Sequence, residues 1–156
     1  TGARFDHHEP PPRVQERGVL YAAHNALTCL AEVYQDTRLI DRSLRQPTLV
    51  GFELTRPVVL LDCTGAWPTR AGASMVIGSG MRARARRWAR VMYAAYPHID
   101  GIRYCSSMYA NTPCVALFER AADAIPPSPV FHRPLADPSM LDALKNAAKT
   151  LGYGLQ

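Results

Sequence analysis

One carboxylate stands out among the residues that could carry chemistry, because of the helix in which it lies. Glu32 is the only acid in Asn25 to Gln35, where apolar residues recur at helical spacing. On a helical wheel it lies opposite the apolar stripe, between Thr28 and Asn25, which are small and uncharged. Two interpretations stay open: an ordinary exposed helix glutamate, or an acid on the floor of a polar cleft where it can act electrostatically.

Other reactive side chains give weaker patterns. Cys105 beside Ser106 could be a nucleophile, but no sequence rule assigns it a histidine base. The adjacent His7 and His8 point to opposite faces of an extended segment, so we expect a surface loop and no metal site. The four cysteines form no CxxC pair, which favours reduced thiols over a disulfide framework.

Positive charge is concentrated in one helix. The net charge is +5, 16 of the 18 basic residues are arginine, and five of them lie between Arg82 and Arg90. The wheel places Arg82, Arg86, Arg87 and Arg90 on one side. The other side has Arg84 as an exception and otherwise holds Ala85, Trp88, Ala89, Val91 and Met92. A solvated surface helix, a nucleic-acid site and a site for an acidic partner all fit this pattern.

The elements that must position these residues suggest an α+β fold with a mixed sheet. Three helices are predicted, at Asn25 to Gln35, Met81 to Tyr96 and Ser139 to Leu151, with Asn25 and Ser139 as caps and Gly152 as a stop. Six strands are predicted, at Gly18 to Ala23, Thr48 to Leu54, Val58 to Asp62, Gly101 to Tyr104, Cys114 to Phe118 and Val130 to Leu135. Val58 to Asp62 is apolar enough to be central, and Pro134 confines the last strand to an edge. Helices are too few for regular βαβ alternation, so one domain with a mixed sheet and about three helices is expected.

The hydropathy of the sequence indicates where in the cell the protein acts. No apolar run approaches the ~18 residues of a transmembrane helix. No basic-then-apolar leader is visible, so a cytoplasmic protein without membrane contact is expected.

Four ordered segments together resemble the RES domain family, which is named for an Arg, a Glu and a Ser. They are GARFD (2–6), LYAAHNALTCLAEVY (20–34), DGIRYCSS (100–107) and NTPCVALFE (111–119). The resemblance implies a single RES-like domain over 1–156. Family members usually carry residues before the Arg and only three precede Arg4, so we expect that an N-terminal segment is missing.

By position, the resemblance carries the family's functional residues onto this chain. The family's Arg falls on Arg4, its Tyr on Tyr21, its Glu on Glu32 and its Ser on Ser106, with Asn111 as a further substrate contact. Arg4, Glu32 and Ser106 are the expected catalytic residues. Arg4, Tyr21, Ser106 and Asn111 are the expected substrate-binding residues.

The function that the resemblance implies is that of a toxin with an ADP-ribosyltransferase-like fold, which uses NAD as substrate and no metal. It would cleave the nicotinamide–ribose bond as an NAD glycohydrolase or phosphorylase, and thus as a hydrolase or glycosyltransferase. A single carboxylate suits this reaction, because nicotinamide leaves as a neutral molecule and needs no second acid. The implied partner is an Xre-type antitoxin. The alternatives are ADP-ribosyl transfer to a protein and a nucleic-acid-binding module built on Arg82 to Arg90, although nucleic acid is not expected for this chain alone.

Overall fold

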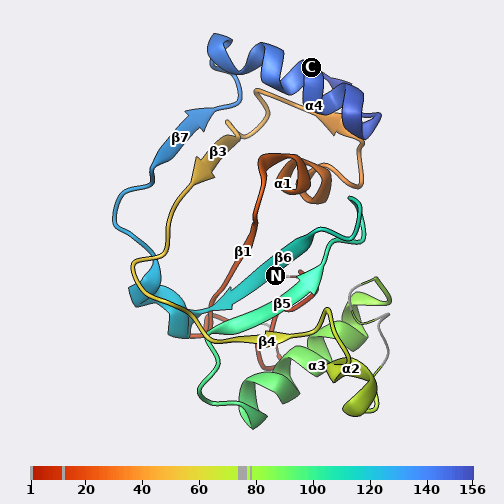
Figure 1. Ribbon diagram of the computed structural model, residues 1–156, viewed down its shortest axis with the longest axis vertical. Coiled ribbons are helices and arrows are strands. Elements are labelled where there is room, and N and C mark those ends of the chain that lie inside the picture. The colour runs from red at the N-terminus through yellow and green to blue at the C-terminus, as the bar shows by residue number, and fades with distance from the viewer. Residues whose placement is uncertain (1, 12, 74–76, 78) are drawn as a thin grey trace.

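A four-stranded mixed sheet forms the centre of the molecule, with strand order β1-β6-β5-β4 (Figure 1). The computed structural model describes residues 2–11, 13–73, 77 and 79–156. β6 pairs antiparallel with both β1 and β5, whereas β4 pairs parallel with β5. In this register Tyr21 lies opposite Ala116, and Tyr104 lies opposite Cys114.

The strands are β1 (Val19–Ala23), β2 (Leu39–Ile40), β3 (Thr48–Gly51), β4 (Leu60–Asp62), β5 (Gly101–Cys105), β6 (Pro113–Phe118), β7 (Phe131–Pro134) and β8 (Gly154–Leu155). The α-helices are α1 (Ala26–Val33), α2 (Trp67–Arg70), α3 (Arg82–Ala95) and α4 (Leu141–Leu151). The 3-10 helices whose bounds lie within the described residues are η2 (Glu119–Ala124) and η3 (Pro138–Met140). No helix in the described part of the chain is both long and apolar enough to cross a membrane.

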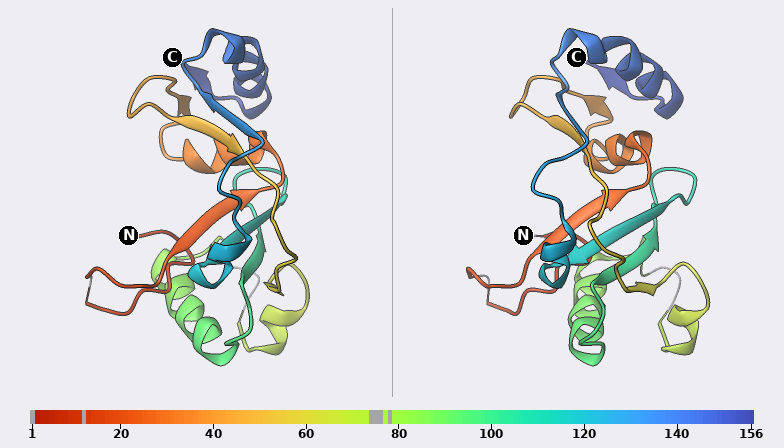
Figure 2. Two further views of the ribbon diagram at one scale, coloured as in Figure 1. Left: turned by 90° about the vertical axis from the view of Figure 1, so that its left-hand side faces the viewer. Right: turned by 60° about the vertical axis from the view of Figure 1, so that its left-hand side comes forward.

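Two hydrophobic cores hold these elements together. The first lies between α3 and one face of the sheet, where Ala89 and Met92 pack against Ile102, Tyr104 and Phe118. The views in Figure 2 show α3 along this face, with α4 at the opposite end of the molecule. The second core is built by residues of α1, α4 and their neighbours, listed as Leu30, Ile40, Leu135, Met140, Leu144 and Ala148.

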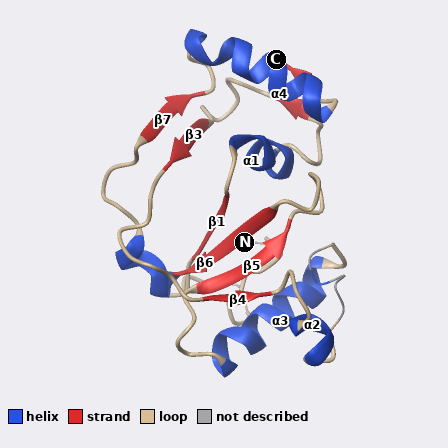
Figure 3. Cartoon of the chain, viewed as in Figure 1, coloured by secondary structure: helices blue, strands red, loops and turns tan. Residues whose placement is uncertain are grey.

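Two short ribbons complete the second core. β2 pairs parallel with β8, and β3 pairs antiparallel with β7, so that chain segments distant in sequence lie side by side (Figure 3). α1 therefore has α4 on one side and the β5–β6 hairpin on the other. This position matters for Glu32, which α1 carries.

The mixed α+β fold is confirmed, and the three predicted helices correspond to α1, α3 and α4. Asn25 caps α1 through its Oδ1, which accepts the N–H of Thr28, and Gly152 ends α4 with a φ of 67°. α2, η2, η3, β2 and β8 lie outside the predicted elements. They are short, and a four-residue helix or a two-residue strand shows no measurable periodicity.

Three local predictions are wrong. β4 is an edge strand rather than a central one, and it begins only at Leu60. Ser139 does not cap α4: it lies within η3, which Asp137 caps by accepting the N–H of Ser139, and α4 begins after Met140 without a side-chain cap. Val91 is 57% exposed, because the buried stripe of α3 is formed by Ala85, Ala89 and Met92.

The N-terminal segment is also more buried than its composition predicts. Phe5, Asp6 and His7 are 0%, 3% and 0% exposed. The His7 ring stacks on Tyr93 at 4.4 Å, and its Nε2 lies 3.1 Å from Glu119 Oε2. The predicted surface loop is therefore wrong at His7, and this anchoring fixes the residues next to Arg4.

Candidate active site

Glu32 and Ser106 are in direct contact although 74 residues separate them in the chain. The Ser106 hydroxyl donates to Glu32 Oε1 at 2.5 Å. Glu32 lies on the last turn of α1, and Ser106 directly follows β5. The half-buried Glu32 is thus held at the junction between α1 and the central sheet.

Ser106 has little capacity left for another ligand. Its side chain belongs to a residue that is 1% exposed, and its Oγ accepts the N–H groups of Met108 and Tyr109, each at 3.1 Å. A hydroxyl offers one donor and two acceptor sites, and all three are used here. This geometry suits a residue that orients Glu32 rather than one that touches substrate.

A hydrogen bond between two threonines links α1 to the turn that carries Ser106. The Oγ1 atoms of Thr28 and Thr112 lie 2.7 Å apart, and Thr28 is 0% exposed. Thr28 Oγ1 also donates to Asn25 Oδ1, which caps the helix. Thr112 in turn accepts the N–H of Ser106 through its carbonyl oxygen at 2.8 Å. These hydrogen bonds therefore link the cap, the helix and the turn, and they hold Glu32 and Ser106 close together.

The opposite side of α1 rests on the C-terminal part of the chain. Leu30 packs with Leu144 and Ala148 of α4 in the second core. The Tyr153 hydroxyl donates to the carbonyl oxygen of Ala31 at 3.3 Å. Buried contacts on both sides thus restrain the helix that bears Glu32.

Arg4 and Tyr21 form a second pair. The Tyr21 hydroxyl accepts the N–H of Phe5 at 2.8 Å, which places Arg4 next to β1. Arg4 Nη1 donates to the carbonyl oxygen of Gly80 at 2.6 Å, so one nitrogen of the guanidinium is held by the segment before α3. Burial raises the pKa of Tyr21 to about 12, so its hydroxyl stays protonated at neutral pH.

Tyr104 is the neighbour that the two pairs share. Its ring packs on Phe5 with a centroid distance of 4.7 Å. Burial raises the pKa of Tyr104 most, the charge of Glu32 adds to the increase, and the charge of Arg4 opposes it. Glu32 and Ser106 thus meet where α1 approaches the end of β5, whereas Tyr21 of β1 holds Phe5, the residue next to Arg4.

Asn111 is placed apart from the other four predicted residues. It is exposed at the tip of the β5–β6 turn with a φ of 51°, next to Ala110 with a φ of 46°. Within the described residues its side chain has no hydrogen bond to the other four. Its role as a substrate contact stays a prediction.

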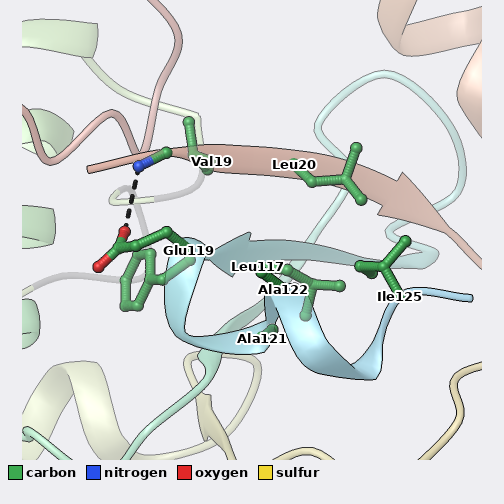
Figure 4. A pocket seen from close by; sticks show the side chains of 9 residues that line it. Val19, Leu20, Leu117, Glu119, Ala121, Ala122 and Ile125 are labelled. Atoms are coloured by element: carbon green, nitrogen blue, oxygen red, sulfur yellow. Dashed lines mark hydrogen bonds between the residues drawn. The ribbon is translucent and has the colours of Figure 1, made fainter. Parts of the chain in front are cut away.

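The described residues hold no group of three or more His, Cys, Asp or Glu side chains that could bind a metal ion. A separate hollow of about 270 Å³ lies between β1, β6 and η2 (Figure 4). Its lining is mainly apolar, and its one carboxylate, on Glu119, accepts the N–H of Gly18 at 3.1 Å. A polar, charged substrate finds more complementary groups at Arg4 and Glu32.

Sequence reasoning missed several residues of this region. Thr28, Thr112 and Tyr104 position the candidate residues, yet each has an ordinary type in an ordinary element. The one usable signal was the small, uncharged surface of α1 around Glu32, which Thr28 shares. The contacts of Thr28, Thr112 and Tyr104 join segments more than 80 residues apart, and no local sequence pattern reveals such contacts.

Comparison with known proteins supports one family. A family model described as RES domain matches residues 1–137 of the 156-residue chain. The matched region contains Arg4, Tyr21, Glu32, Ser106 and Asn111, and it ends before η3 and α4. Neither the curated proteins nor the solved structures give a match.

Proposed function

Because the chain belongs to the RES domain family, we propose that it is a toxin that consumes NAD by cleaving the nicotinamide–ribose bond. The family is consistent with an NAD-related, toxin-like module. The specific reaction, an ADP-ribosyltransferase-like fold and an Xre-type antitoxin as partner are parts of this proposal.

The observation that carries the proposal is the Ser106–Glu32 hydrogen bond of 2.5 Å, which holds the carboxylate of α1 at the end of β5. Ser106 binds one oxygen of the Glu32 carboxylate, Oε1, so the other oxygen stays available for a substrate. The guanidinium of Arg4 supplies the charge that a diphosphate requires. The carboxylate and the guanidinium thus match the nicotinamide-bearing ribose and the diphosphate of NAD.

Each side chain then has a chemical role. Arg4 binds the diphosphate with the guanidinium nitrogens that Gly80 does not hold. Tyr21 offers its aromatic ring to the flat, cationic nicotinamide. Glu32 stabilises the positive charge that develops on the ribose as the bond breaks.

The reaction balances without a second acid. The electron pair of the C1′–N bond goes to the nicotinamide nitrogen, so the leaving group departs as neutral nicotinamide. The acceptor then attacks C1′: water gives ADP-ribose and one proton, and phosphate gives ADP-ribose 1″-phosphate. A side chain of another protein as acceptor gives the alternative reaction, ADP-ribosyl transfer.

Ser106 acts in this proposal through Glu32. Its donor and acceptor sites are all occupied, so it sets the orientation of the carboxylate rather than contacting ribose. Asn111, at the exposed tip of the turn, contributes a substrate contact if the turn closes over bound NAD.

Incubation of the purified protein with NAD tests the proposal. Nicotinamide release is followed by liquid chromatography in three reactions, with water alone, with inorganic phosphate and with a bacterial protein extract. Release of nicotinamide in any reaction is expected, and the second product identifies the acceptor. NAD that stays intact in all three reactions, with folded protein, would contradict the proposal.

A further inference from the structure

The exposed side of α3 is rich in arginine, and the proposed function does not use it. We define the α3 face as the residues that point away from the first core, namely Ala83, Arg84, Arg87, Arg90, Val91 and Ala94. They recur at helical spacing opposite the buried Ala85, Ala89 and Met92. Arg84 and Arg87 are exposed, Arg90 is half-buried, and Val91 is 57% exposed.

The arginines of this face have no counter-charge. α3 contains no acidic residue, and in the described part of the chain none of its five arginines forms an ion pair. Some arginines outside α3 do form ion pairs: Arg56, for example, binds both Asp100 and Asp123. Unpaired like charges along one helix repel each other, and an anionic partner would relieve that repulsion.

The chemistry of the face favours an acidic protein over a nucleic acid. Val91 follows the three arginines on this face, and Ala94 lies one turn further on, so the face has a cationic N-terminal part and an apolar C-terminal part. Arginine beside apolar side chains is typical of protein interfaces. Phosphates alone would leave Val91 without an apolar contact.

Aromatic stacking, which supports binding of single-stranded nucleic acids, is not offered here. Trp88 packs edge-on against Trp67 with a centroid distance of 6.2 Å. The Tyr93 ring is already covered by the Arg120 guanidinium at 3.6 Å and the Arg17 guanidinium at 4.7 Å. The exposed residues of α3 are otherwise arginine, alanine and Val91, none of which offers an aromatic ring for base stacking.

We infer that the α3 face binds an acidic, amphipathic segment of a partner protein, whose carboxylates pair with Arg84, Arg87 and Arg90 and whose apolar side chains cover Val91. This mode corresponds to the recognition of an amphipathic helix through anchors at helical spacing. The inference does not depend on the reaction proposed above, because it rests on α3 alone.

Direct binding measurements test the inference without any assay of NAD. The full chain is titrated with three fluorescent probes at ~0.15 M salt: a synthetic helical peptide with Glu and Leu at i, i+3, i+4 and i+7, poly-L-glutamate of equal charge, and a 20-base-pair DNA duplex. The variants are Arg84→Glu/Arg87→Glu and Val91→Asp. The matched control is Lys145→Glu/Lys149→Glu, which makes the same change of charge on the exposed side of α4.

We expect the amphipathic peptide to bind wild-type protein at least ~10-fold more tightly than poly-L-glutamate or duplex DNA. The Arg84→Glu/Arg87→Glu variant should lose at least ~10-fold in affinity for the peptide, whereas the α4 control should lose little. Val91→Asp should abolish the preference for the peptide over poly-L-glutamate. Absence of peptide binding, equal loss in the control, or tighter binding of DNA than of the peptide would each overturn the inference.

Discussion

Ser106 Oγ lies 2.5 Å from Glu32 Oε1. Ser106 Oγ also accepts the N–H groups of Met108 and Tyr109. Residues from the end of a helix and from the turn after a strand are thus joined by one hydroxyl. Because that hydroxyl is buried and fully used, we propose that it orients the carboxylate. Substitutions at Ser106 and at Thr28 can separate the effect of this arrangement on activity from its effect on stability.

Removal of the Ser106 hydroxyl should slow catalysis more than it weakens binding. Ser106→Ala frees Glu32 to change its rotamer, so we expect kcat to fall by about 100-fold, with KM changed little. Steady-state measurement of nicotinamide release gives both constants. Ser107→Ala, at the exposed neighbour, is the control and should retain wild-type kcat. A Ser106→Ala variant that raises KM at constant kcat would instead indicate a substrate contact.

The link between Thr28 and Thr112 should contribute to stability as well as to geometry. Thr28→Val keeps the shape of a fully buried side chain but removes its hydrogen bonds to Asn25 and Thr112. We expect the free energy of unfolding to fall by about 1–3 kcal/mol. Urea denaturation measures this change, and Thr150→Val on the exposed side of α4 is the control. Equal stabilities of Thr28→Val and wild type would show that the link is not needed.

His7 should make stability depend on pH. Burial is the main cause that lowers the pKa of His7 below 6.5, and it outweighs the opposite effect of Glu119. The unfolded chain therefore binds a proton at a higher pH than the folded chain. Stability from this group is complete above pH 6.5 and is lost as pH falls towards the lower pKa of the folded state.

Urea denaturation at several pH values between 5 and 8 measures this dependence. His7→Gln, which keeps a donor for Glu119 but cannot ionise, should flatten the curve. His132→Gln, at an exposed position of β7, should leave the curve unchanged. The aspartates with lowered pKa values, such as Asp100 and Asp137, titrate below this range. A His7→Gln curve as steep as that of the wild type would contradict the assignment.

Gly101 should tolerate no side chain. A Cβ at this position would lie 2.9 Å from Leu117 Cα and closer still to the Ala116 carbonyl oxygen, both in the backbone of β6. Gly101→Ala should therefore push β5 away from β6 and lower the free energy of unfolding by about 3 kcal/mol or more. Gly65→Ala, where no atom lies within 4 Å of the added Cβ, is the control. Thermal denaturation of the two variants should differ clearly, and similar midpoints would show that the strands can adjust.

The sequence predicts the local elements well where a pattern is long enough. α1 is predicted from Asn25 as a cap and from its apolar stripe, and both are confirmed in the structure. Glu32 is correctly placed on the polar side of that helix. β4 is mispredicted as central because an apolar run reports burial and not the position of a strand in the sheet.

Contacts between distant segments could not be predicted from such patterns. The burial of His7 depends on Glu119, 112 residues away, and the Ser106–Glu32 contact depends on the pairing of β5 with β6. Without the family resemblance, Ser106 would be one loop hydroxyl among several. Val91 is misplaced because the wheel alone does not fix which direction faces the core.

The central claim is that Glu32 assists cleavage of the nicotinamide–ribose bond. It is tested most directly by the rate of nicotinamide release from saturating NAD by wild type and by Glu32→Gln, with NAD binding measured by calorimetry on both proteins. The account predicts that Glu32→Gln binds NAD with similar affinity and releases nicotinamide at least ~100-fold more slowly. Equal rates for the two proteins would contradict it.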